Sequence, residues 1–344
     1  MASHGAPAQP DLTVVVTFFR LRHLAPVTIR NLSLVEGRER FQLVLLDDAS
    51  GDGTADVIRR HCRMWLPEAE VVELEHNVGV SAARNVGLAR ARGRWITYLD
   101  GDDFVSADYW ASVVADADRL DVDFVRTDFV RVEGLKRDLG RVPHQRRGVR
   151  QAAGEGVLPF DHGASVDYPR CSAGVYRTDL RERGLLEYRE DLRTCEDRHH
   201  IWTLHLRADT FAVVDHAGSF YRRDIGTSLT RTPSEKQMDF LPAYRSIVDM
   251  VQQHEQSERF MPKAVRGLLA MTAFHLGARA RFTRDLEEEL VRRCRRTLDD
   301  VPQDALAEGL RRLDGKRRAV VERLRAGELE LISADPAATS GAGR

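Results

Sequence analysis

Short apolar segments alternate with helix-like segments over the first hundred residues of the chain. The apolar segments are rich in β-branched residues and predict strands at 13–19, 41–47, 71–75 and 95–100. Patterns typical of helices lie between them, at about 24–36, 54–65 and 80–92. Because the strands carry no polar face, we expect an α/β fold with a mostly parallel sheet flanked by helices, which binds ligands beyond the carboxyl ends of its strands.

The pattern changes twice in the rest of the chain. Residues 121–232 mix strands such as Phe124–Val132 with an arginine- and glycine-rich span at 137–156, which we expect to be a mobile loop. After Pro233 the apolar residues recur with helical spacing, and we expect helices at about 234–256, 260–281, 284–298 and 304–326. The sequence thus predicts an α/β domain at 11–232 with halves 11–120 and 121–232, a helical region at 233–330, and disordered tails at 1–10 and 331–344.

The composition excludes several classes of protein. The 344 residues have a formal net charge of -1, so the excess of positive charge that drives general nucleic-acid binding is missing. The four cysteines have no CxxC spacing, which argues against a zinc site or a disulfide framework and favours a reducing cytoplasm. No apolar stretch reaches the roughly 18 to 20 residues that span a bilayer. We expect a cytoplasmic protein and leave peripheral association with the inner face of the membrane open.

Two acidic clusters, about 50 residues apart, each follow an apolar strand. The first lies in LVLLDDASGDGT and contains Asp47 and Asp48; the second lies in WITYLDGDD and contains Asp100, Asp102 and Asp103. Carboxylates gathered at strand ends repel one another and resist burial unless a cation or a polar ligand compensates them. The two clusters therefore predict a metal and nucleotide site.

The residues of the first cluster have a simpler explanation as well. DDASGDGT is also typical of an ordinary turn, since Asp, Ser and Gly favour tight turns. At a strand end, however, Asp48 could accept a hydrogen bond from the imide N–H of uracil or from a ribose hydroxyl. Arg84 follows in a helix start made of small residues, where its guanidinium could hold a base carbonyl or a phosphate; a solvent-exposed arginine is the alternative.

The second cluster and an acidic pair further along supply the candidate chemistry. Asp102 offers a hard oxygen ligand for Mg²⁺ or Mn²⁺, and Asp100 a contact to ribose or to a metal-bound water. A divalent ion would neutralise the charge of a departing diphosphate. Glu196 and Asp197 precede a helical pattern whose N-terminus favours ionised carboxylates, so they are candidates for a general base or simply a capped helix.

These motifs resemble those of family 2 glycosyltransferases with the GT-A fold. The resemblance covers residues 11 to about 232 and rests on TVVVTFFR, LLDDASGDGT, NVGVSAARNVGLARARGRWITYLDGDD and CSAGVYRTDLRERGLLEYREDLRTCEDRHHIW. It implies an inverting transferase that uses a nucleotide-activated sugar and a divalent metal. In TFFR the chain departs from the family, which more often has Tyr-Asn, so base stacking would fall to Phe19 without its usual polar neighbour.

The resemblance also implies roles for individual residues. Thr17 and Phe19 match the strand end that lines the base pocket, Asp48 the base-binding aspartate and Arg84 the nucleotide-binding arginine. Asp100 matches the ribose contact, Asp102 the metal ligand, Asp197 the catalytic base and Glu196 its supporting or acceptor-orienting neighbour. SFYRRDIGTSLTR resembles the segment that closes over the diphosphate, with Arg223 and Ser228 as contacts; a strand edge in solvent explains its arginines equally well. His216, just before this segment, is a further candidate for a metal or phosphate contact, although a lone histidine is more often structural.

The sequence therefore predicts transfer of a hexose or N-acetylhexosamine from a UDP-sugar to a hydroxyl of a glycan, cell-wall polymer or other glycoconjugate. The alternatives are a nucleotidyltransferase, whose glycine-rich phosphate loop is not seen in TFFRLRHLAP, and a catalytically degenerate nucleotide-sugar-binding scaffold. The basic segments KRRAVVERLRAG and RRCRRTLDD could seat the helical region on anionic lipid or a polyanion, but interleaved acidic residues favour a solvated helix face. Self-association through these helices is a further possibility.

Overall fold

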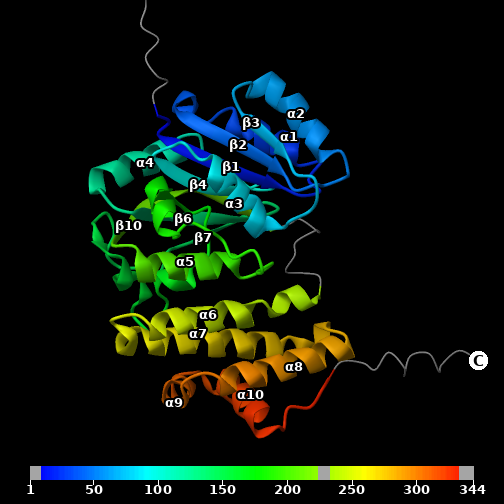
Figure 1. Ribbon diagram of the computed structural model, residues 1–344, viewed down its shortest axis with the longest axis vertical. Helices are drawn as coiled ribbons and strands as arrows, with labels where there is room; N and C mark the ends of the chain where they lie inside the picture. Colours follow the sequence, from blue (N-terminus) through cyan, green and yellow to red (C-terminus); the bar gives the residue numbers. More distant parts are fainter. Residues whose placement is uncertain (1–8, 224–232, 333–344) are drawn as a thin grey trace, which may run out of the picture.

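The computed structural model describes residues 9–223 and 233–332, which form an α/β part above a layer of helices (Figure 1). Within these residues one ten-stranded sheet has the order β3-β2-β1-β4-β9-β6-β10-β5, with β7 paired to β6 and β8 paired to β10. The strands are β1 (Leu12–Phe18), β2 (Phe41–Asp47), β3 (Glu70–Glu73), β4 (Trp95–Asp100), β5 (Phe104–Val105), β6 (Phe124–Glu133), β7 (Lys136–Gly140), β8 (Gln151–Ala152), β9 (Gly174–Arg177) and β10 (Thr210–Arg222).

The first four strands are parallel, and both of their faces are covered. Val14 and Val16 of β1 pack toward α1 (Ala25–Leu32), α2 (Thr54–Trp65) and α4 (Tyr109–Leu120). Val15, on the other face, packs in a cluster with α3 (Val80–Arg90) and α5 (Glu196–Arg207). A Cβ on Gly87 of α3 would lie 2.3 Å from Val15 Cγ1, so the glycine allows the close approach of helix and sheet. The predicted α/β architecture is confirmed.

The sheet continues into the second half of the α/β part through an antiparallel strand. β9 pairs antiparallel with both β4 and β6, while β6 and β10 run parallel with an irregularity between Val214 and Ser219. The span at 137–156, predicted to be a mobile loop, is instead anchored. Arg147 forms ion pairs with Asp128 and Asp215, and Gly148 N donates to Val213 O at 2.7 Å.

The helical layer consists of α6 (Phe240–Gln252), α7 (Ser257–Gly277), α8 (Arg284–Asp299), α9 (Gln303–Arg311) and α10 (Gly315–Ala326). It lies below α5 in Figure 1, and its apolar core includes Trp202 and Leu206 of that helix. The prediction of a single helix at 304–326 is wrong, because the helix is interrupted between the end of α9 at Arg311 and the start of α10 at Gly315. There Asp314 accepts a hydrogen bond from Arg317 N at 3.0 Å and so caps α10.

Several predicted elements have the observed boundaries, namely the strands at 41–47 and 95–100 and the helix at 54–65. The predicted tails fall largely on residues 1–8 and 333–344, which lie outside the described part of the chain. Among the described helices, none combines the length and the apolar character needed to cross a bilayer.

Candidate active site

The second acidic cluster lies at the carboxyl end of the central strand β4. In the register of the sheet Asp100 is the partner of Thr17, and the next residue, Gly101, donates its N–H to Thr17 O at 2.8 Å. A Cβ on Gly101 would lie 2.3 Å from the ring of Phe18, so only glycine fits at this turn. The turn brings together Asp100, Asp102 and Asp103, which we call the acidic triad: one carboxylate oxygen from each lies within 4.8 Å of the others.

The electrostatics of the acidic triad favour a bound cation. Burial, with the neighbouring charge of Asp100, raises the pKa of Asp102 to about 6. Burial also raises the pKa of Asp103, and the charges of Asp100 and Asp102 raise it further. A hydrogen bond from Arg222 N, 2.8 Å from the Asp103 carboxylate, acts in the opposite direction. Three hard oxygen donors that repel one another are the ligand set that Mg²⁺ or Mn²⁺ prefers, so the residues fit the metal that the sequence predicts.

Arg84 of α3 joins the acidic triad to the predicted base. Its side chain is 3% exposed and donates to Asp100 Oδ1 at 2.9 Å, to Asp197 Oδ1 at 2.7 Å and to Glu196 Oε1 at 3.1 Å. The guanidinium carbon also lies 5.1 Å from the centroid of the Tyr188 ring. Burial alone would lower the pKa of Arg84, but the surrounding anionic groups, Asp197 and Asp100 among them, raise it well above the usual value. One cation thus holds carboxylates from the two halves of the α/β part together.

Glu196 and Asp197 are the first residues of α5, as the sequence predicts for a pair at a helix N-terminus. Asp197 Oδ2 lies 3.5 Å from Cys171 N, and its other oxygen binds Arg84. Burial, followed by the charge of Asp197, raises the pKa of Glu196 to about 7. Among the described residues only Asp197 of this pair lies near Cys171 N, so the two carboxyls differ in their contacts, which suits a division of labour between them.

The raised pKa of Glu196 predicts how its removal changes stability. Glu196 is protonated in the folded protein up to about pH 7 but ionises near 4.5 when unfolded, so stability falls as the pH rises through this window. Glu196→Gln is therefore expected to raise the melting temperature by a few degrees at pH 8 and by less at pH 5. Thermal melting at both pH values, with the exposed Glu187→Gln as control, measures this. An equal shift at both pH values would contradict it.

Asp48 directly follows β2 and contacts the loop that leads into α3. It is buried and accepts hydrogen bonds from Val78 N at 2.7 Å, Gly79 N at 2.8 Å and Asn77 Nδ2 at 2.8 Å. Its Oδ1 accepts only one of these bonds among the described residues, which leaves capacity for a ligand donor. Asp48 therefore fixes the start of the helix that carries Arg84.

The two predicted base-pocket residues lie at the end of β1. Phe19 follows the strand with 41% of its surface exposed, which leaves its ring open to a planar ligand. Thr17 lies between Leu46 of β2 and Asp100 of β4 in the sheet. The carboxyl ends of three neighbouring strands therefore bring Thr17, Phe19 and Asp100 to one edge.

The segment after β10 is described only in part. Arg223 follows the strand, with its guanidinium carbon 5.9 Å from the centroid of the Tyr221 ring. Ser228 lies outside the described residues. His216, expected as a further metal or phosphate contact, instead faces α4, where its Nε2 lies 2.9 Å from Asp116 Oδ2; that expectation is wrong because the irregularity in β10 turns this stretch toward the helix.

Sequence reasoning missed two residues of the site. Asp103 belongs to the acidic cluster but has no predicted role of its own, and no sequence pattern points to Arg170. Arg170 lies in the loop before β9, and its Nη2 is 3.5 Å from Asp103 Oδ2. No spacing or periodicity links residues that far apart in the chain, so the only signal was the density of acids in LDGDD.

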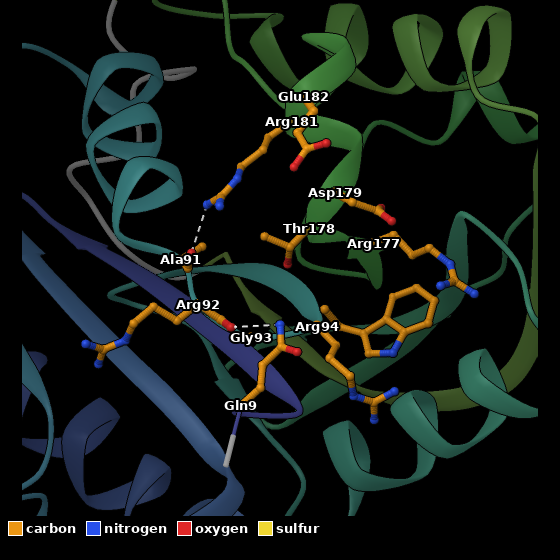
Figure 2. Close-up of a pocket in the computed structure, with 11 residues that line it drawn as sticks. Gln9, Ala91, Arg92, Gly93, Arg94, Arg177, Thr178, Asp179, Arg181 and Glu182 are labelled. Atoms are coloured by element: carbon orange, nitrogen blue, oxygen red, sulfur yellow. Dashed lines mark hydrogen bonds between the residues drawn. The ribbon is translucent and has the colours of Figure 1, made fainter. Parts of the chain in front are cut away.

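A cavity of about 320 Å³ lies at the opposite, amino-terminal end of β4 (Figure 2). Its arginines are largely engaged within the protein: Arg181 donates to Ala91 O at 2.9 Å, and Arg94 donates to Asp118 Oδ1 at 2.9 Å. Ligands of such sheets bind at the carboxyl ends of the strands. The cavity beside Trp95 is therefore separate from the candidate active site.

Comparison with known proteins agrees with this geometry. Residues 13–172 match the model of glycosyl transferase family 2. The uncharacterized glycosyltransferase EpsJ of Bacillus subtilis (strain 168) is 25% identical over 67% of this chain and 66% of its own length. Poly(ribitol-phosphate) beta-N-acetylglucosaminyltransferase TarS of Staphylococcus aureus (strain MW2) is 24% identical over 54% of this chain and 30% of its own. The chain thus spans less than two thirds of either relative.

A solved structure shows the same fold. Residues 1–349 of S. aureus TarS, in complex with UDP-GlcNAc, superpose on the chain with a TM-score of 0.71 and 19% sequence identity, covering 92% of each chain. This likeness extends through the helical layer as well as the α/β part. The predicted GT-A fold is confirmed, and the match over residues 13–172 supports the resemblance of this part of the chain to glycosyl transferase family 2.

Proposed function

We propose that the protein is an inverting, metal-dependent transferase that moves a sugar, of the hexose or N-acetylhexosamine type, from a UDP-sugar to a hydroxyl of a cell-wall polymer or related glycan. The observation that carries the proposal is the position of Arg84, which binds Asp100 beside the acidic triad and Asp197 at the start of α5. The structure of TarS in complex with UDP-GlcNAc supports a UDP-sugar as the donor. The name of that relative contains poly(ribitol-phosphate), which supports a cell-wall polymer as the acceptor. We keep the cytoplasm, or the inner face of the membrane, as the expected location.

In this proposal each half of the site has one task. Phe19 stacks on the uracil and Asp48 accepts a hydrogen bond from it, while Asp100 binds the ribose. Asp100, Asp102 and Asp103 would hold Mg²⁺ or Mn²⁺, and the ion would supply neutralisation of negative charge on the diphosphate. Asp197 accepts the proton of the acceptor hydroxyl as that oxygen attacks the anomeric carbon, the bond from this carbon to the diphosphate oxygen breaks and UDP leaves, while Glu196 orients the acceptor. Arg223 binds the diphosphate of the donor, and Ser228, which lies outside the described residues, stays a predicted second contact.

Binding of donor and metal tests the proposal through stability. A ligand that binds only the folded state raises the melting temperature, so UDP-sugars with Mn²⁺ or Mg²⁺ should raise it by more than the metal or the nucleotide sugar alone. Asp102→Asn removes one charged oxygen ligand, so we expect the affinity for the metal to fall about 10-fold or more and the metal-dependent part of the melting shift to shrink. The shift that UDP produces without metal should persist.

A matched control separates this effect from a general loss of negative charge. Asp56→Asn changes an exposed aspartate of α2, outside the site, and should leave the metal-dependent shift unchanged. Melting curves at increasing Mn²⁺ with UDP-GlcNAc, UDP-glucose and GDP-mannose supply the measurement. A shift produced only by GDP-mannose would refute the uridine donor, and a full metal response in Asp102→Asn would refute the metal site.

A further inference from the structure

Arginine and aromatic side chains alternate on the second half of the sheet, beginning at the acidic triad. We call this group the arginine–aromatic ladder; it consists of Arg170, Tyr221, Phe129 and Arg131. The guanidinium carbon of Arg170 lies 3.5 Å from the centroid of the Tyr221 ring and 5.3 Å from that of Phe129. The guanidinium carbon of Arg131 lies 5.9 Å from the Phe129 centroid on the outer side.

The ladder lies on the face of the sheet that carries the predicted base. Phe129 and Arg131 are two residues apart on β6, so their side chains share a face, and Arg131 is the partner of Tyr221 in the register with β10. Phe129 packs in the same core cluster as Ile201 of α5, the helix that begins with Glu196 and Asp197. At its inner end Arg170 faces Asp103, so the ladder leads from the reaction centre outward over β6 and β10.

The cations of the ladder have spare hydrogen-bonding capacity. Arg131 is exposed, and no carboxylate among residues 9–223 and 233–332 lies within 4.0 Å of it; its cross-strand neighbour Asp138 pairs with Lys136 at 3.1 Å. Arg170 Nε is buried and has no hydrogen-bond partner there. A guanidinium stacked on a ring keeps its N–H edges free for forked bonds to phosphate or carboxylate. Such an arrangement suits an anionic ligand.

We propose that the ladder binds the anionic groups of the acceptor, and that the acceptor is a polymer with phosphodiesters or carboxylates at regular intervals. The inference rests on the proposed function. The donor site lies at the ends of β1, β2 and β4, whereas the ladder runs along β6 and β10 and ends at an exposed cation. A polyanion held by Arg131 and Arg170 would deliver a hydroxyl to Asp197, and a neutral glycan would leave Arg131 without an anionic partner among the described residues.

The test compares Arg131→Gln with Arg137→Gln, an exposed arginine of β7 whose guanidinium donates to Gly134 O and Lys136 O at 2.7 and 2.8 Å. The probes are a poly(ribitol phosphate) oligomer, a polyuronate oligomer and neutral dextran, with affinities measured by fluorescence anisotropy on the full chain; UDP affinity is measured alongside. Arg131→Gln should weaken binding of an anionic oligomer about tenfold, as expected for a charge-assisted hydrogen bond. Arg137→Gln and UDP affinity should change less than twofold.

The outcomes are distinct. A preference for the phosphate or the uronate oligomer identifies the anionic group, and either one supports the proposal. Equal binding of dextran, or an unchanged affinity in Arg131→Gln, overturns it. A loss of UDP affinity in Arg131→Gln equal to the loss of oligomer affinity also overturns it, because the ladder would then bind the donor diphosphate. If the wild-type chain binds the anionic oligomers but no UDP-sugar, the proposed function is refuted, while binding of anionic polymers by the arginine–aromatic ladder is still supported.

Discussion

Asp197→Asn is expected to lower sugar transfer by about 10²- to 10⁴-fold while leaving UDP affinity near that of the wild type. The substitution keeps the size of the side chain and an oxygen that accepts from Arg84, whose Nη1 lies 2.7 Å from Asp197 Oδ1. It removes the carboxylate that would take the proton from the acceptor hydroxyl, and a hydroxyl that keeps its proton is a poor nucleophile. Initial rates with UDP-sugar and acceptor, together with UDP binding by calorimetry, measure the two effects separately.

The control is Asp191→Asn, which changes an exposed aspartate paired with Arg189 in the loop before α5 and should leave transfer unchanged. Substantial transfer by Asp197→Asn would refute its role as the base. In that case Glu196→Gln, which changes the other carboxyl of the pair, should lose transfer instead. A loss of both transfer and UDP binding in Asp197→Asn would show that the residue acts through Arg84 on the donor site.

The location of the site could be predicted from the sequence because parallel sheets have a simple geometry. Apolar strands that end in aspartates put Asp48 and Asp100 at one edge, and the sheet register confirms this with Phe18 opposite Asp47 and Thr17 opposite Asp100. The helix that begins at Glu196 could also be predicted, since its apolar pattern starts immediately after the acidic pair. Local pattern and sheet topology were sufficient for these features.

Contacts between distant segments could not be predicted in the same way. Arg170 faces Asp103, and Arg222 donates its backbone N–H to the same carboxylate, yet neither lies in a motif or a periodic segment that points to Asp103. Such contacts depend on how β9 and β10 dock on the first half of the sheet. The break between α9 and α10 is different, because Asp314-Gly315 is a readable turn and helix-start signal that the helical periodicity on either side concealed.

The position of Arg84 leads to the prediction with the largest effect on stability. Arg84→Met would leave Asp100, Glu196 and Asp197 facing one another without their shared cation. Removing one partner of a buried ion pair costs about 3–5 kcal/mol, because the remaining charges stay buried and unpaired. We expect a melting temperature lower by roughly 10 °C at pH 8, and loss of transfer, since the same guanidinium positions the predicted base. Arg90→Met, which changes a half-buried arginine on the same helix with its Nε 3.2 Å from Glu70 Oε1, should shift the melting temperature by less than about 3 °C.

The pH dependence distinguishes this explanation from a packing defect. Burial and the charge of Asp197 already raise the pKa of Glu196 to about 7, and without the charge of Arg84, which lowers it, this pKa rises further. A carboxyl whose pKa is higher in the folded than in the unfolded state destabilises the protein as the pH rises through that interval, and this cost vanishes when both states are protonated. The difference in melting temperature between Arg84→Met and the wild type should therefore shrink as the pH falls from 8 to 5. A difference that stays constant over this range would mean that Arg84 stabilises the fold by filling space against Tyr188, and that its charge does not hold the two halves of the site together.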